Sequence, residues 1–170
     1  DENGHLSLEM IKSKISAKTK MACITHMSNV FGSILDVKEI CKELKKRGII
    51  TVLDGSQAVV HLEVDVKSIG CDFYTFTGHK LFGPTGTGVL YIDKSRIAEM
   101  SPFIGGGEMI RSVTKSDVIY NNSPFLFEAG TPGIAEIIGL GAAIDFVQKL
   151  NRRSILEYEK SLSDYTRTEL

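Results

Sequence analysis

Apolar residues along the chain follow two kinds of spacing, one typical of helices and one typical of buried strands. Spacing of three and four residues predicts helices over residues 7–17, 36–47, 135–150 and 154–169. Short apolar runs, some of them rich in β-branched residues, predict strands over residues 21–25, 49–53, 72–76 and 88–92. Asp36 fits the N-cap of the second helix, and Gly48 fits the position just past its end.

The order of these elements indicates the fold class. Short apolar strands separated by helices are typical of an α/β domain, so we expect a three-layer α/β/α fold with a mainly parallel sheet. The length of 170 residues is enough for one domain with a sizeable core. Periodicity disappears over residues 101–123, around a run of three glycines. We expect a long irregular segment there, of the kind that is often functional.

Charge and hydropathy exclude several classes of partner. The formal net charge is -1, and the basic residues at 42–47 end a predicted helix, where they complement the helix dipole. We therefore expect neither nucleic acid nor a membrane as a partner. No apolar run is long enough to span a bilayer, and the polar residues 1–4 do not resemble a secretory signal peptide.

The three cysteines favour a reducing compartment. Cys23, Cys41 and Cys71 form no close pair, and their odd number argues against a disulfide framework. Cys23 lies in a predicted strand and Cys71 lies just before another, so we expect both in the core, whereas Cys41 lies on a helix face. No cysteines or histidines have the spacing of zinc ligands, so we expect no metal site. A cytoplasmic location fits this pattern.

Chemically reactive residues follow two of the predicted strands. In residues 52–57, Val-Leu-Asp-Gly-Ser-Gln, Asp54 stands where an apolar strand ends. In residues 77–86, Thr-Gly-His-Lys-Leu-Phe-Gly-Pro-Thr-Gly, Lys80 follows another strand in a glycine-rich loop. Parallel α/β sheets bind ligands at the carboxyl ends of their strands, so Asp54 and Lys80 are expected to face one crevice.

A lysine and an aspartate in one crevice suit pyridoxal phosphate. The cofactor needs an amine for its Schiff base, and it needs a carboxylate that keeps its pyridine nitrogen protonated. Thr77, Gly78 and His79 supply groups that suit a phosphate, directly beside Lys80.

Each of these residues also has an ordinary structural explanation. An aspartate after a strand is commonly a turn former, a lysine after a glycine-rich loop is commonly solvated, and a single histidine is more often structural. The cofactor site is favoured because both turns carry residues that suit the same cofactor.

Other ligand motifs do not fit the sequence. No P-loop pattern is present. Gly139 and Gly141 lie inside a predicted helix, so they do not form the strand-to-helix turn of a dinucleotide site, and they indicate tight helix packing instead.

The two turns resemble those of the class V aminotransferase-like enzymes of fold type I. More narrowly, they are similar to the SUF-type cysteine desulfurases and selenocysteine lyases. Residues 25–32, Thr-His-Met-Ser-Asn-Val-Phe-Gly, and residues 127–132, Phe-Glu-Ala-Gly-Thr-Pro, belong to the same pattern. The resemblance covers the whole chain in one register. It implies that residues 1–150 form part of a pyridoxal-phosphate-binding large domain and that residues 151–170 lead towards a small domain.

The resemblance also implies roles for individual residues. Lys80 would bind the cofactor covalently and move protons at the substrate Cα. Asp54 would pair with the pyridine nitrogen, and Gln57 would hydrogen-bond the phenolic oxygen.

Further roles concern the phosphate and the substrate. Thr77 and His79 would hold the phosphate, and Asn29 would reach the cofactor and the substrate carboxylate. Thr131 would contact the phosphate of a neighbouring subunit's cofactor, which implies a homodimer.

The activity implied is conversion of L-cysteine to L-alanine, with sulfur passed as a persulfide to an acceptor protein of iron-sulfur cluster assembly. Members of the family are over twice this length. The nucleophilic cysteine, the carboxylate-binding arginine and the histidine that stacks on the cofactor have no counterpart here, so we expect the chain alone to be inactive. Two alternatives remain: another class V enzyme, such as a selenocysteine lyase or an aminotransferase, and an inactive structural or dimerisation fragment.

Overall fold

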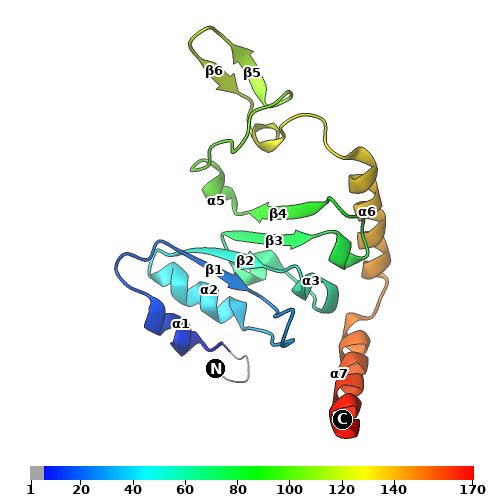
Figure 1. The fold of residues 1–170 in the computed structure, drawn as a ribbon. Coiled ribbons are helices and arrows are strands. Elements are labelled where there is room, and N and C mark those ends of the chain that lie inside the picture. The colour runs from blue at the N-terminus through cyan, green and yellow to red at the C-terminus, as the bar shows by residue number, and fades with distance from the viewer. Residues whose placement is uncertain (1–5) are drawn as a thin grey trace.

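A four-stranded sheet forms the centre of the structure, a computed structural model that describes residues 6–170; the polar run at residues 1–4 lies outside them. The strands are β1 (Met21–Thr25), β2 (Ile50–Asp54), β3 (Phe73–Thr77) and β4 (Gly88–Ile92), in that spatial order. β1, β2 and β3 are parallel, and β4 is antiparallel to β3 (Figure 1). The predicted α/β class with a mostly parallel sheet is confirmed.

Four helices lie close to their predicted positions, namely α1 (Leu8–Lys14), α2 (Val37–Lys46), α6 (Ile134–Gln148) and α7 (Arg152–Glu169). Three helices of four residues each were not predicted, namely α3 (Ala58–His61), α4 (Val66–Ile69) and α5 (Lys94–Ile97), and neither were the 3-10 helices η1 (His79–Leu81) and η2 (Phe125–Phe127). Asp36 caps α2 by accepting from the backbone N–H of Glu39, as predicted, and Gly48 has φ +67° just past that helix. The first helix ends earlier than its predicted limit because Ile15 is extended.

The core lies on the face of the sheet that α2 covers. Leu53 of β2 and Tyr74 of β3 pack with Cys41 of α2 and Val147 of α6 in one cluster. Cys71 is buried in the same cluster, as expected from its position before β3. The expectation that Cys23 is also a core residue was wrong: its side chain is exposed, because alternate residues of β1 point away from the helices.

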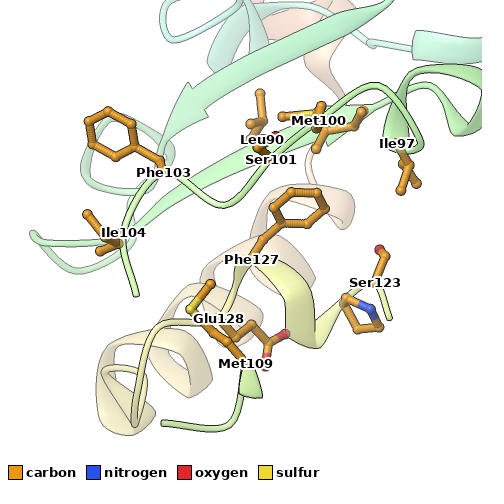
Figure 2. Close-up of a pocket in the computed structure, with 12 residues that line it drawn as sticks. Leu90, Ile97, Met100, Ser101, Phe103, Ile104, Met109, Ser123, Phe127 and Glu128 are labelled. Carbon is orange, nitrogen blue, oxygen red and sulfur yellow. The ribbon is translucent and has the colours of Figure 1, made fainter. Parts of the chain in front are cut away.

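The opposite face of the sheet is less covered in the part of the chain that the structure describes. Met21 and Leu90 on this face are 50% and 52% exposed. Beside β4, an apolar cavity of about 550 Å³ lies between the sheet, α5 and η2, with Leu90, Met100 and Phe127 among its lining residues (Figure 2). Among residues 6–170, the third layer of the fold therefore consists of short elements next to β4.

The segment 101–123 is more ordered than predicted. It contains an antiparallel hairpin of β5 (Ile110–Val113) and β6 (Val118–Tyr120), which projects away from the main sheet in Figure 1. The turn is closed by a hydrogen bond from Thr114 N–H to the carbonyl of Asp117, 2.9 Å long. Every residue of both strands is exposed, so neither strand has the alternation of buried and polar positions by which sequence reasoning detects a strand.

Residues 6–170 contain neither a membrane-spanning helix nor a cluster of metal ligands. Within that range, no helix combines the length and apolar character that crossing a membrane requires. The same residues contain no group of three or more His, Cys, Asp or Glu side chains that could hold a metal ion.

Candidate active site

A cavity of about 200 Å³ lies at the carboxyl ends of β1 and β2, next to the loop that follows β3. It brings together four of the seven predicted site residues, which are Asn29, Asp54, Gln57 and Lys80. The remaining lining residues are Thr25, Met27, Ser28 and Ser56. The lysine and the aspartate, which are 26 residues apart in the sequence, therefore share one cavity.

Strand register and a tight turn place Asp54 at this cavity. Asp54 is the last residue of β2 and pairs with Thr25 of β1 on one side and Thr75 of β3 on the other. One carboxylate oxygen accepts a 2.9 Å hydrogen bond from the backbone N–H of Ser56. Gly55 has no room for a side chain, since a Cβ there would lie 2.1 Å from the ring of Tyr74. The turn after β2 therefore requires glycine.

The lysine loop is a compact turn between β3 and β4. The backbone N–H groups of Leu81 and Gly83 both donate to the carbonyl of Gly78, at 2.9 and 3.0 Å. Leu81 is buried in the core, and the neighbouring Lys80 donates from its Nζ to Oδ1 of Asn29 at 3.3 Å. Phe82 has φ +60°, a left-handed conformation that costs a residue with a Cβ about 1–2 kcal/mol.

Helix α6 supports this loop from one side, close to the carboxyl end of β3 (Figure 1). A Cβ at Gly139 would lie 2.7 Å from Cγ of Pro84, so the helix and the loop approach each other as closely as glycine allows. The ring of Phe82 meets Phe146 edge to face, with centroids 5.9 Å apart. Gly139 thus serves tight helix packing, as the sequence predicted, and the packing holds the turn that carries Lys80.

Three predicted site residues do not line the cavity. Thr77 and His79 bond to each other, with Oγ1 and Nδ1 2.7 Å apart, and the His79 side chain is exposed. They lie immediately before Lys80 in the chain, on the flank of the site. Thr131 is exposed in the segment between η2 and α6 and is not among the residues that line the cavity.

A buried histidine that sequence reasoning did not single out lies beneath the site. Nδ1 of His26 and the hydroxyl of Tyr74 are hydrogen-bonded at 2.9 Å, and the backbone N–H of His26 donates to the carbonyl of Asp54. Burial lowers the pKa of His26 and raises the pKa of Tyr74, so this pair is neutral at pH 7. The position of His26 directly after β1 could have identified it from the sequence, because residues that follow parallel strands border the site.

A second contact that sequence reasoning missed extends from the cavity to α7. Nε2 of Gln57 lies 3.0 Å from Nε2 of His61, and Nδ1 of His61 lies 2.8 Å from Oε2 of Glu159. His61 and Glu159 are separated by 98 residues, so no local pattern could have revealed this contact.

The donor set of the cavity fits pyridoxal phosphate. An amine and a carboxylate face the same space, and two side-chain amides, those of Asn29 and Gln57, border it. The amine suits the aldehyde of the cofactor, the carboxylate suits a protonated ring nitrogen, and the amides suit its oxygen substituents. The larger apolar cavity beside β4 contains none of the predicted site residues.

Comparison with known proteins identifies the family. The model of the class-V aminotransferases matches residues 1–170, the whole of the chain. The chain belongs to the class-V aminotransferase family. The resemblance seen in the lysine loop is thereby confirmed, and membership of this family implies pyridoxal phosphate as the cofactor.

Individual class-V relatives are cysteine desulfurases. A probable cysteine desulfurase from Xylella fastidiosa (strain 9a5c) is 45% identical over 168 residues, which are 99% of this chain and 40% of that protein. The apo structure of cysteine desulfurase from Thermococcus onnurineus NA1 superposes with a TM-score of 0.92 at 37% identity, covering 99% of this chain and 42% of the other. The cysteine desulfurase CsdA from Escherichia coli superposes with a TM-score of 0.88 at 34% identity, covering 93% and 40%. The chain therefore spans about 40% of the length of these relatives.

Proposed function

We propose that the full-length protein to which this chain belongs is a pyridoxal-phosphate-dependent cysteine desulfurase. The observation that carries the proposal is the shared cavity of Lys80 and Asp54, which unites the amine and the carboxylate that this cofactor requires. The named relatives, at 34–45% identity, support the choice of reaction within the class-V family. When bound, the cofactor supplies an electron sink for the carbanion that forms at the substrate Cα.

The residues at the cavity have different roles in cofactor binding and proton transfer. Lys80 binds the cofactor aldehyde and moves a proton at the substrate Cα. Asp54 keeps the ring nitrogen protonated, and Gln57 donates to the phenolic oxygen. Asn29 orients the Lys80 amine and contacts the substrate carboxylate, and the hydrogen bond that its Oδ1 accepts from Lys80 supports the first of these roles.

Residues on the flank of the cavity complete the proposal. Thr77 and His79 hold the phosphate through side chains that the structure places together. Thr131 is exposed and does not line the cavity of Lys80, which suits a contact with the cofactor of a second subunit and hence a homodimer. In this arrangement residues 1–150 belong to the large domain, and residues 151–170 lead towards the small domain.

The reaction transfers one sulfur atom. L-cysteine and an enzyme thiol yield L-alanine and an enzyme persulfide: the thiolate attacks the substrate sulfur, the Cβ–S bond breaks, and Cβ takes a proton. None of Cys23, Cys41 and Cys71 lines the cavity, so the thiol comes from another part of the protein. The outer sulfur of the persulfide then passes to a thiol of an acceptor protein of iron-sulfur cluster assembly in the cytoplasm, which regenerates the enzyme thiol.

The test replaces Lys80 in the full-length protein. Lys80→Ala is expected to abolish the visible absorption band of lysine-bound cofactor and to stop alanine formation from L-cysteine. Lys94→Ala, on the exposed surface of α5, is the matched control and should retain both. An unchanged band in Lys80→Ala would exclude Lys80 as the anchor. Faster turnover of L-selenocysteine than of L-cysteine would instead favour a selenocysteine lyase.

A further inference from the structure

A three-residue hydrogen-bonded chain connects the cavity of Lys80 to α7. Gln57, which lines the cavity, bonds to His61 of α3, and His61 bonds to Glu159 of α7. We propose that His61 and Glu159 are positioning residues that fix the side-chain amide of Gln57, so that one of its N–H groups donates into the cavity. The inference rests on the proposed function, because the acceptor in the cavity is the phenolic oxygen of pyridoxal phosphate.

The chemistry of the three groups sets the direction of each hydrogen bond. A carboxylate only accepts, so Nδ1 of His61 carries a proton and donates to Oε2 of Glu159 over 2.8 Å. In a neutral imidazole the other nitrogen then carries a lone pair, and Nε2 accepts from the amide of Gln57 over 3.0 Å. If the amide flipped, its carbonyl oxygen would face this lone pair, which is repulsive. Glu159 therefore selects the histidine tautomer, and the tautomer selects the orientation of Gln57.

Burial and packing fix the geometry of the hydrogen-bonded series Gln57, His61 and Glu159. The His61 side chain is 15% exposed, so little water competes for its two ring nitrogens, whereas Glu159 is 41% exposed and accessible to substitution. α7 contacts the end of α3 at a second point, where Arg152 donates to the carbonyl of Leu62. Arg152 and Glu159 are seven residues apart, about two helical turns, and so lie on one face of α7. The same face thus holds both the end of α3 and the histidine ring.

The first arm of the test needs no cofactor. In the cofactor-free full-length protein, nitrogen NMR of histidine rings should show His61 in the tautomer with the proton on Nδ1. Glu159→Gln should shift it towards the tautomer with the proton on Nε2. Glu157→Gln on the same helix, where Glu157 pairs with Arg153, is the matched control and should leave the signal unchanged. A His61 signal that does not respond to Glu159→Gln overturns the inference, whatever the enzyme does.

The second arm measures the cofactor site. His61→Leu removes the acceptor and should shift the visible band of the bound cofactor in the same direction as Gln57→Ala. It should also raise the Kd for pyridoxal phosphate about three- to tenfold, the effect of one lost hydrogen bond. His61→Gln restores an acceptor on a side chain of similar reach and should recover most of the wild-type spectrum, which a merely structural role for His61 does not predict.

The outcomes separate this inference from the proposed function. If Lys80→Ala keeps the band, the proposed function fails. If Lys80→Ala loses the band and Gln57→Ala shifts it, while His61→Leu matches the wild type, the positioning role alone fails. Should His61→Leu not fold, Glu159→Gln decides the matter, because its exposed position tolerates the change: either an unchanged histidine signal or an unshifted band overturns the inference.

Discussion

At the residue scale, a single glycine decides how the carboxylate of Asp54 is presented. Gly55 follows Asp54, and the ring of the buried Tyr74 occupies the space in which any side chain at this position would lie. The hydroxyl at this same end of the tyrosine is hydrogen-bonded to His26, so the ring has little freedom to move away. The turn, the aromatic ring and the histidine therefore depend on one another.

We predict that Gly55→Ala lowers the free energy of unfolding by about 1–3 kcal/mol, because the new methyl group overpacks a buried ring. Urea denaturation of the full-length protein measures this. Gly105→Ala is the control, since a Cβ there would meet nothing within 4 Å and the stability should change little. Equal stability of the two variants would show that Tyr74 can move aside at no cost.

At the element scale, one carboxylate connects β2, the start of β3 and α5. Asp72 accepts hydrogen bonds from the backbone N–H and the hydroxyl of Thr51, at 2.8 and 3.0 Å, and from Nε of Arg96 at 2.7 Å. Burial by itself raises the pKa of Asp72, but the hydrogen bonds from Thr51 and Arg96 together outweigh it and hold the pKa below its ordinary value. The ionised form is therefore the one that stabilises the fold.

The pH dependence of stability follows from the lowered pKa of Asp72. A carboxyl group whose pKa is lower in the folded state contributes stability above its ordinary pKa and loses it as the pH falls through the folded-state value. We predict that Asp72→Asn lowers the free energy of unfolding by about 1.5–3 kcal/mol at pH 7, because it removes hydrogen bonds to a charged group. The loss should shrink as the pH falls below about 4.

Thermal unfolding between pH 7 and pH 3 checks this prediction. Asp164→Asn, on the exposed surface of α7, is the control and should follow the wild type at every pH. A difference between Asp72→Asn and the wild type that stays constant down to pH 3 would mean that the charge of Asp72 contributes nothing.

At the scale of the whole molecule, the positions of the cysteines limit what this chain can do alone. Cys41 and Cys71 are buried, and burial raises the pKa of Cys71 to about 11, which leaves little thiolate at pH 7. Cys23 is exposed, but it lies two residues before Thr25 on β1 and does not line the cavity. No thiol among the described residues is placed over a substrate held at Lys80.

We therefore predict that the 170-residue chain releases no sulfide from L-cysteine under reducing conditions, even with added pyridoxal phosphate. Correct placement of a nucleophile accounts for about 7–11 kcal/mol of a barrier, so a thiol in the wrong place cannot substitute. The full-length protein is the positive control. Turnover comparable to that control would mean that one of the three cysteines reaches the substrate.

The local pattern of the sequence determined which segments form the sheet and its main helices, and it predicted that residues of two turns meet at one cavity. Apolar periodicity is a local property, and parallel strands bring their carboxyl ends to one edge, so the sequence alone was sufficient to pair Asp54 with Lys80. Tertiary structure decided the rest. Strand pairing formed the exposed hairpin of β5 and β6, the direction of β1 exposed Cys23, and the packing of α7 on α3 brought Glu159 to His61. These outcomes depend on contacts between distant residues, and periodicity within a short window contains no information about them.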